Sequence, residues 1–287
     1  MICIGNLTTG GTGKTPMVAE VVRRLSERGR RPAIVSRGWG GDEARLFADW
    51  LPRVPHRCDR DRVWAARVAV ELDGADCIVL DDGFQHWRLE RDLAVVLDDA
   101  TDPFGGGHLL PRGYLREPPR ALRRAGLVVL TRCDQAGEAA RRRTLERIAR
   151  WTDAPVAFAR HREVEVVDLP GGAAAPPASL AGRRVHAFCG IGRPEAFRAT
   201  LEGLGARVVA FDELPDHHTY AEGELDRLLL AGRVAGAERS ITTEKDAVKL
   251  REQARADRSF SYLRVSLGIV SGESAFDEAL DRALGRR

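Results

Sequence analysis

The residues best suited to chemistry lie near the start of this chain. The segment Thr8–Thr15 reads T-T-G-G-T-G-K-T and follows a short apolar run. In such a segment glycines let backbone N–H groups surround phosphate oxygens, Lys14 would reach the β- and γ-phosphates, and the Thr15 hydroxyl would bind Mg²⁺. Although Thr8 stands where G-x-x-x-x-G-K-[ST] has its first glycine, we interpret the segment as a P-loop rather than a glycine-rich turn with a chance Lys-Thr pair. Its expected nucleotide-binding residues are Thr8, Thr9, Gly10, Gly11, Thr12, Gly13, Lys14 and Thr15.

A pair of carboxylates follows a second apolar run. Asp81 and Asp82 come directly after residues 76–80, which have the composition of a buried strand. A carboxylate at the end of such a strand can bind Mg²⁺ directly or through water, opposite Thr15. By itself the pair could be an acidic strand-to-loop turn. Beside a P-loop, it predicts the acidic part of a magnesium site.

A second acidic pair, Asp42 and Glu43, lies in a glycine-rich loop after the expected strand 32–36. Phosphoryl transfer to an alcohol needs positioning, charge neutralisation and a carboxylate that accepts the hydroxyl proton. Asp42 and Glu43 are therefore candidates for the general base. An alternative stays open, in which Asp42 caps a helix and Glu43 lies in its first turn.

Two further residues are candidates on weaker patterns. Arg116 lies in a proline-bounded loop, where it could bind a substrate phosphate or transition-state charge, or be a plain surface arginine. His217 follows Asp216 and could orient a catalytic carboxylate or relay its proton. The pair His217–His218 could also bind a metal, but no further histidine or cysteine is spaced to complete such a site.

The elements that position these residues alternate between strand and helix. We expect strands at 1–4, 32–36, 76–80, 93–97, 126–130, 185–189, 207–211, 240–243 and 262–266. We expect helices at 16–28, 43–50, 61–72, 194–204, 222–231 and 274–284. Continuous apolar strands that alternate with helices indicate a parallel sheet covered on both faces. Because ligands bind beyond the carboxyl ends of such strands, where the motifs fall, we expect one active-site cleft.

The predicted fold is α/β, with a P-loop NTPase-like parallel sheet domain and a second, smaller α/β domain. We place the P-loop domain at residues 1–152, a linker at 153–180 and the smaller domain at 181–287. The linker contains the clearest loop of the chain, Gly171–Pro177, which is rich in glycine, alanine and proline.

The composition is that of a soluble globular protein. A net charge of +3 over 287 residues is too small to imply nucleic-acid binding, and we interpret Arg141–Arg143 as a solvated helix face rather than an anion patch. Five scattered cysteines without a C-x-x-C pair favour a reducing, cytosolic setting. There is no signal peptide and no apolar run long enough to span a bilayer, so any membrane contact is expected to be peripheral.

Taken together, these stretches resemble the tetraacyldisaccharide 4'-kinases, the lipid A 4'-kinases of Gram-negative bacteria. The resemblance covers nearly the whole chain and keeps the order of the motifs. The D-D-G-F-Q-H and T-E-K-D-A-V-K blocks make it specific, because they are not general P-loop features. The matching stretches are Gly5–Pro16, Ser36–Gly40, Gly41–Glu43, Asp81–His86, Leu109–Pro118, Phe188–Ile191, Pro215–His218 and Thr242–Leu250.

The resemblance implies transfer of the ATP γ-phosphate to the 4'-hydroxyl of a tetraacyldisaccharide 1-phosphate, with Mg²⁺, at the cytosolic face of the inner membrane. It implies a P-loop kinase domain and a smaller α/β domain joined by a short β linker, with the site in between. It implies a lipid substrate at a membrane surface, and neither a nucleic-acid nor a protein partner.

The resemblance also assigns roles by position. Asp42 matches the family's proposed base and His217, which directly follows Asp216, its dyad partner. The expected catalytic residues are Asp42, His217, Lys14 and Arg116. The expected metal-site residues are Thr15, Asp81 and Asp82. The expected substrate-site residues are Glu43, Gln85, His86, Arg116 and Glu117.

Two departures from the family pattern stand out. Family members usually carry a few tens of residues before the first strand, forming a helix that helps seat the enzyme on the membrane, whereas here Met1 nearly starts the strand. The expectation is a start further upstream or a different anchor. The segment between Gly38 and Gly41 is also much shorter than usual, which affects how Asp42 is positioned.

Parts of the sequence are also compatible with two other functions. Thr131–Asp134 stands where a guanine-specifying T-K-x-D would lie in a P-loop GTPase or metallochaperone that acts as a nucleotide switch. Arg132 in place of the lysine, together with the family blocks, argues against a switch. A catalytically silent binding protein is disfavoured because its catalytic candidates are intact: Lys14, Thr15, Asp42, Asp82 and His217.

Overall fold

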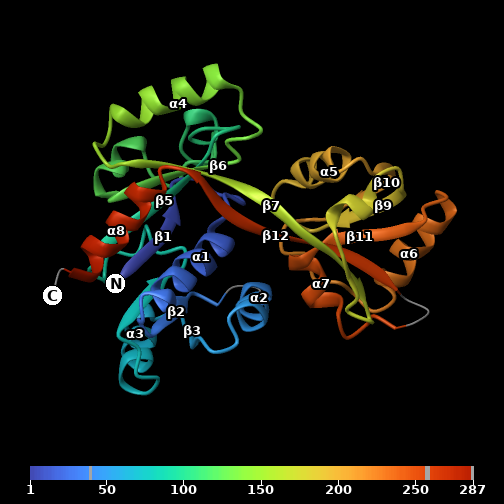
Figure 1. Cartoon of the computed structure of the whole chain (residues 1–287), viewed down its shortest axis with the longest axis horizontal. Coiled ribbons are helices and arrows are strands. Elements are labelled where there is room, and N and C mark those ends of the chain that lie inside the picture. Colours follow the sequence, from blue (N-terminus) through green and yellow to red (C-terminus); the bar gives the residue numbers. More distant parts are fainter. Residues whose placement is uncertain (39–40, 256–258, 286–287) are drawn as a thin grey trace. The chain divides into compact units, whose positions relative to one another are not determined.

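The computed structural model describes residues 1–38, 41–255 and 259–285, which form two compact α/β units (Figure 1). The first unit comprises residues 1–38, 47–161 and 267–285. The second comprises residues 41–46, 162–255 and 259–266. Gly40 of the family motif lies outside the described residues.

The first unit is built on parallel strands in the order β7-β6-β5-β1-β4-β2-β3. These strands are β1 (Ile2–Asn6), β2 (Pro32–Ser36), β3 (His56–Cys58), β4 (Cys77–Leu80), β5 (Leu93–Asp99), β6 (Leu127–Thr131) and the start of β7 (Val156–Leu169). The helices are α1 (Lys14–Glu27), α3 (Arg62–Glu71), α4 (Glu138–Ala149) and α8 (Glu273–Gly285), with α2 (Asp42–Trp50) belonging to this unit from Phe47 onward.

Alternate residues of these strands face two separate cores, as the predicted double coverage requires. Ile2 and Ile4 of β1 pack with α1 and α8, in a core that includes Met17 and Phe276. Cys3, between them, packs on the opposite side with the alanines of α3. Both faces of the parallel sheet are therefore covered by helices, which leaves the carboxyl ends of its strands as the place for polar groups.

The second unit has the same kind of construction on a smaller scale. Its strands are β9 (Arg184–Cys189), β10 (Arg207–Glu213), β11 (Arg239–Thr243) and parts of β7 and β12 (Phe260–Ser271), with β8 (Ala174–Ala175) beside β7. The order is β10-β9-β11-β12, with parallel β10-β9, β9-β11 and β11-β12 pairs. Helix α5 (Pro194–Gly203) covers one face, and α6 (Glu224–Val234) and α7 (Glu244–Leu250) cover the other.

Several elements differ from the sequence prediction. The sequence patterns missed β3 and α7, which are short, and gave no bounds for α4. The helix predicted at 274–284 is real, but it belongs to the first unit and not to a domain spanning 181–287. The reason is tertiary: α8 pairs with α1 through Arg24–Asp277 and Arg28–Asp281 at 2.9 Å each, and its Phe276 is fully buried.

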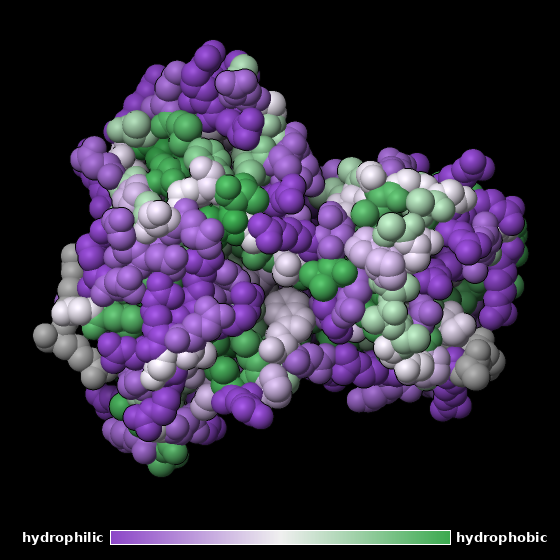
Figure 2. Space-filling model, in the orientation of Figure 1, coloured by the Kyte–Doolittle hydropathy of each residue, from purple (hydrophilic) through white to green (hydrophobic). Residues whose placement is uncertain are grey.

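The arginine-rich helix α4 presents a hydrophilic outer surface (Figure 2). Thr144 and Ile148 are buried beneath it, whereas Arg142 and Arg143 are exposed. This is the solvated helix face that the sequence predicts. Across the described ranges, no helix combines the length and the apolar character needed to span a membrane.

Candidate active site

The P-loop connects the end of β1 to the start of α1. Gly13 caps α1 with a left-handed backbone (φ +87°), and Gly10 also has a positive φ of +101°. Glycine adopts these conformations without the strain of a Cβ atom. The loop therefore brings backbone N–H groups and the positive end of the helix dipole together, which is an anion-binding arrangement. Lys14 and Thr15 are the first two residues of α1.

Asn6 is hydrogen-bonded to this loop through its side chain, a role that the sequence patterns do not assign. It is the last residue of β1 and is fully buried. Its Nδ2 donates to the Thr12 hydroxyl at 2.8 Å, and its Oδ1 accepts from Lys14 Nζ at 3.5 Å. One amide thus fixes both the loop and the lysine.

Asp82, after β4, is held by cations. Arg116 donates to both of its carboxylate oxygens, at 3.0 and 2.7 Å, and Lys14 Nζ lies 3.7 Å from Oδ1. Arg116 also donates to Asn6 Oδ1. Burial alone would raise the pKa of Asp82, but the bond from Arg116 and the charge of Lys14 outweigh it and lower that pKa to about 2. Asp82 is therefore a carboxylate at neutral pH.

The next residues of the D-D-G-F-Q-H block extend this cluster. Gln85 Nε2 donates to the Asn6 carbonyl and to Glu117 Oε1, both at 3.0 Å. Glu117 in turn accepts from Arg124 at 2.7 Å. His86 is partly buried, and burial together with nearby arginines lowers its pKa. The sequence-predicted residues Gln85, Arg116 and Glu117 are thus joined in one hydrogen-bonded network with Asn6.

The donors expected for a magnesium ion fit its chemistry. Among the residues that the structure describes, no three His, Cys, Asp or Glu side chains are grouped to hold a metal by themselves. Mg²⁺ does not need such a cage, because it is bound by one or two carboxylates, waters and substrate phosphates. Asp81 is buried, Asp82 is ionised, and both belong to the same unit as Thr15. These three residues could hold the ion.

Arg132, in the Thr131–Asp134 motif, is hydrogen-bonded to the P-loop. It is buried, has a left-handed backbone (φ +53°) and pairs with Asp99 at the end of β5. Its other terminal nitrogen donates to the Gly11 carbonyl at 2.8 Å. Arg132 is therefore a structural brace of the loop in this chain.

The second unit holds a different cluster around Asp42. Asp42 is the first residue of α2 and is 1% exposed, and its Oδ2 lies 3.2 Å from His217 Nδ1. Burial favours the neutral acid, but the bond from His217 and the charges of Lys245 and Lys249 prevail, so the pKa of Asp42 lies well below its usual range. The bond to Asp42 likewise raises the pKa of His217, against burial and Lys245. Asp42 is thus the first residue of α2 rather than its cap, since the Gly41 carbonyl accepts from Arg45 N at 3.2 Å. Asp42 also contacts the predicted histidine.

Two lysines of this cluster were missed by the sequence patterns. Lys245 Nζ lies 3.7 Å and Lys249 Nζ 3.5 Å from Asp42 Oδ2. Both belong to α7, which begins after Thr243, whose side chain accepts from Asp246 N as a helix cap. The signal was present in the T-x-x-D of Thr243–Asp246, which overlaps the K-x-x-x-K of Lys245–Lys249, because residues four apart share a helix face.

The predicted site residues therefore divide into two groups. The first unit gathers the P-loop residues Thr8, Thr9, Gly10, Gly11, Thr12, Gly13, Lys14 and Thr15 with Asp81, Asp82, Gln85, His86, Arg116 and Glu117. The second unit gathers Asp42, Glu43 and His217. The expectation that all of them serve one cleft stays a prediction.

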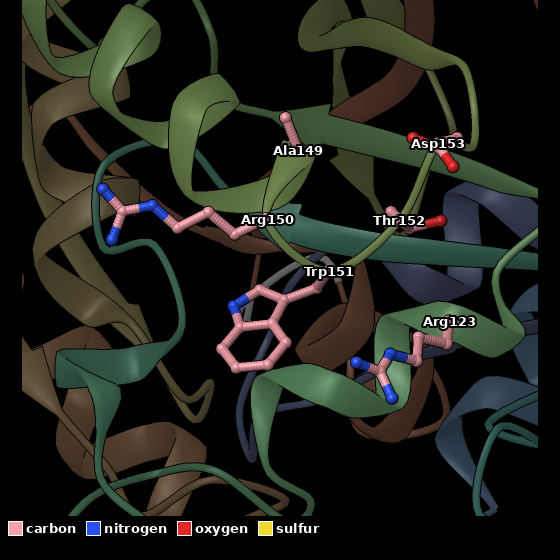
Figure 3. A pocket seen from close by; sticks show the side chains of 6 residues that line it. All are labelled: Arg123, Ala149, Arg150, Trp151, Thr152 and Asp153. Carbon is pink, nitrogen blue, oxygen red and sulfur yellow. The ribbon is translucent and has the colours of Figure 1, made fainter.

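A separate hollow of about 300 Å³ lies at the other end of the first unit's strands (Figure 3). It is lined by Arg123, Ala149, Arg150, Trp151, Thr152 and Asp153. These residues precede β6 and β7, so the hollow lies at the amino edge of the sheet, away from the P-loop. In Figure 3 the Arg150 side chain points away from the Trp151 ring.

Comparisons with known proteins converge on one family. The family model described as LpxK, tetraacyldisaccharide-1-P 4'-kinase, matches residues 1–285. A tetraacyldisaccharide 4'-kinase of Anaeromyxobacter sp. (strain Fw109-5) is 46% identical over 312 residues, covering 100% of this chain and 83% of the relative. That of Syntrophus aciditrophicus (strain SB) is 40% identical over 304 residues, covering 96% and 81%. A crystal structure of LpxK from Aquifex aeolicus, described as an "apo" form in complex with ATP, matches with a TM-score of 0.72 and 29% identity, covering 98% of this chain and 87% of that one.

Proposed function

Because this chain belongs to the tetraacyldisaccharide-1-phosphate 4'-kinase family, we propose that it transfers the γ-phosphoryl group of ATP to the 4'-hydroxyl of a tetraacyldisaccharide 1-phosphate. The observation that supports the proposal is the pair of cations, Lys14 at the start of α1 and Arg116, that converge on Asp82 beside the P-loop, where phosphates of a nucleotide would be bound. The alternative of a nucleotide switch is not favoured, because the family match extends over residues 1–285.

In this proposal the first unit binds and polarises the nucleotide. The backbone of Thr8–Gly13 surrounds the β-phosphate, and Lys14 neutralises charge on the transferred group. Arg116 exchanges part of its bonding with Asp82 for the phosphoryl oxygens, since a guanidinium can serve two anions in one plane. Gln85, His86 and Glu117 position Arg116 and the phosphorylated sugar of the acceptor.

A magnesium ion, held by Thr15 with Asp81 and Asp82, would neutralise negative charge on the β- and γ-phosphates of ATP. Arg116 and Lys14 lower the pKa of Asp82 to about 2, so its carboxylate can supply an oxygen ligand at neutral pH. Asp81 precedes it in the chain and is buried.

The second unit supplies the group that removes the hydroxyl proton. Asp42 accepts the proton of the 4'-hydroxyl as the phosphoryl group moves to the oxygen, and His217 orients its carboxylate. Glu43, beside Asp42 at the start of α2, contacts the sugar. Support comes from the burial of Asp42 and its 3.2 Å contact with His217.

The acceptor's lipid chains place the reaction at a membrane surface, which in this proposal is the cytosolic face of the inner membrane. The acyl chains stay in the bilayer because each buried methylene contributes about 0.8 kcal/mol. The protein would work there as a peripheral enzyme.

The test is a transfer assay in detergent micelles, with the product analysed by mass spectrometry. The proposal expects one phosphate to be added on the 4' oxygen of tetraacyldisaccharide 1-phosphate. An acceptor methylated at that oxygen is the control and should gain none. Phosphate on another oxygen, or equal transfer to the blocked acceptor, would contradict the proposed specificity.

A further inference from the structure

Three large apolar side chains are exposed on the loop of residues 105–115, just before Arg116. Leu109 is 47%, Leu110 52% and Tyr114 60% exposed. A single exposed apolar side chain is ordinary, but a short segment that presents several of them marks a contact surface. The site described above uses none of these three side chains, so they call for a partner of their own.

The backbone that carries these side chains is hydrogen-bonded within the loop. Three of its amides donate to carbonyls of the same loop at 3.0 Å each: Leu110 to Leu115, Gly113 to Leu109 and Leu115 to His108. Leu115 is 1% exposed and belongs to a core of the first unit. A segment can enter an apolar phase only if its backbone groups are satisfied internally. These bonds meet that condition at the turn that carries the two exposed leucines.

The 105–115 loop is joined to the P-loop by main-chain hydrogen bonds. Thr9 N donates to the Tyr114 carbonyl at 2.8 Å, and Arg116 N donates to the Leu7 carbonyl at 2.7 Å. The exposed apolar side chains therefore belong to a loop that adjoins the expected phosphate site. An acceptor whose acyl chains stay in a bilayer can bring its hydroxyl group to that site only if the bilayer lies close to it.

The charge of this region is complementary to an anionic surface. Residues 105–115 include no acidic residue, and Arg112 at the turn is exposed. Arg147 of α4 lies at the base of the loop, with its guanidinium 4.7 Å from the centre of the Phe104 ring and a terminal nitrogen 3.6 Å from the position of a Cβ atom at Gly107. Cations beside apolar and aromatic side chains are typical of surfaces that bind anionic lipid headgroups.

We propose that the 105–115 loop docks the first unit on an anionic bilayer, with its apolar side chains at the boundary between headgroups and acyl chains and the two arginines against the headgroup phosphates. The inference rests on the proposed function for its purpose, which is to bring the P-loop to a lipid acceptor. A free phosphate in solution would use the arginines but not Leu109 and Leu110. The exposed leucines therefore favour a bilayer as the partner.

The test is binding of the full chain to vesicles of phosphatidylcholine with phosphatidylglycerol, measured by co-sedimentation. Wild type should bind, and Leu110→Glu should weaken binding by at least about tenfold, because it replaces a buried apolar side chain with a charge. Leu72→Glu is the matched control: Leu72 is 76% exposed but follows α3 before β4, at the amino edge of the sheet. It should bind like wild type. A wild type that does not bind, or equal binding by Leu110→Glu, would overturn the proposal.

Two further variants test charge and depth. Arg112→Gln should weaken binding to the mixed vesicles and leave binding to phosphatidylcholine alone unchanged, since only the former carry net negative charge. Leu110→Trp keeps a large apolar side chain, and lipids with brominated acyl chains should quench its added fluorescence. Leu72→Trp should gain no such quenching. An unquenched Leu110→Trp on vesicle-bound protein would place another surface against the bilayer and refute the role of this loop.

The same variants separate docking from the proposed reaction. Leu110→Glu should raise the KM for tetraacyldisaccharide 1-phosphate in vesicles by about tenfold, in line with its weaker binding, and leave the Kd for ATP unchanged. If wild type transfers no phosphate, the proposed function fails, while the vesicle measurements still decide the docking. Weaker vesicle binding with an unchanged KM for the lipid acceptor would contradict the inferred purpose of the loop.

Discussion

Arg116 donates hydrogen bonds to Asp82 from both of its terminal nitrogens, at 3.0 and 2.7 Å, and the same carboxylate lies 3.7 Å from Lys14 Nζ. A bidentate pair of this kind depends on the planar fork of arginine. We therefore expect Arg116→Lys to lower kcat by about a hundredfold, because a lysine offers a point charge without the fork. The measurement is steady-state transfer at saturating ATP.

Arg112→Lys provides the matched control, because Arg112 is exposed and belongs to the same proline-bounded loop. It should retain wild-type turnover. If Arg116→Lys were as active as Arg112→Lys, the pair with Asp82 would have no part in catalysis.

Asp42→Asn should reduce turnover by roughly two to four orders of magnitude, the usual cost of losing a general base. Binding of ATP should change little, because the P-loop belongs to the other unit. Turnover and ATP affinity are measured on the same preparation. Asp49→Asn, an exposed change on the same helix, is the control. Near-normal turnover of Asp42→Asn would remove Asp42 from the mechanism.

Acidification should weaken the second unit through Asp42. Since the pKa of Asp42 is lower in the folded chain than its ordinary value of 3.8, its stabilising effect is complete above that value and is lost as the pH falls below it. Asp42→Asn should therefore increase hydrogen exchange of the β9 amides at pH 6 more than at pH 3. An equal increase at both pH values would contradict this linkage.

Gly5→Ala should destabilise the first unit and shift the D-D-G-F-Q-H block. A Cβ atom at Gly5 would lie 2.6 Å from Phe84 Cβ and 2.9 Å from its backbone nitrogen. Such overpacking typically costs about 1–3 kcal/mol. Urea unfolding followed by tryptophan fluorescence measures it, and Gly137→Ala, with open space around its Cβ position, is the control. If the free energy of unfolding of Gly5→Ala equalled that of Gly137→Ala, β1 would be able to shift at Gly5 without destabilising the unit, and the prediction would be wrong.

The sequence could predict those features that depend on local pattern. The strand, glycine loop and helix around Lys14 are continuous in the chain, so their arrangement follows from residue order. The alternation of Ile2, Cys3 and Ile4 between two cores follows from the twofold period of a strand. The doubly covered parallel sheet was predicted on these grounds and is confirmed.

The features that the sequence did not predict depend on tertiary contacts. Helix α8 joins the first unit because its acidic residues meet Arg24 and Arg28, which are about 250 positions away in sequence. The sequence motif did not indicate a role for Lys245, because Lys245 contacts His217 only through the folded helix α7. Asn6 lies two residues beyond the strand expected at 1–4, and its two side-chain bonds form only when the loop folds back over it.

The most direct test of the central claim is transfer of labelled phosphate from ATP to tetraacyldisaccharide 1-phosphate by wild type and by Lys14→Ala. We expect 4'-phosphorylated product from wild type and at least about a hundredfold less from Lys14→Ala, because the lysine neutralises charge in the transition state. Transfer by Lys14→Ala at the wild-type rate, or none by a wild-type protein that binds ATP, would contradict the account.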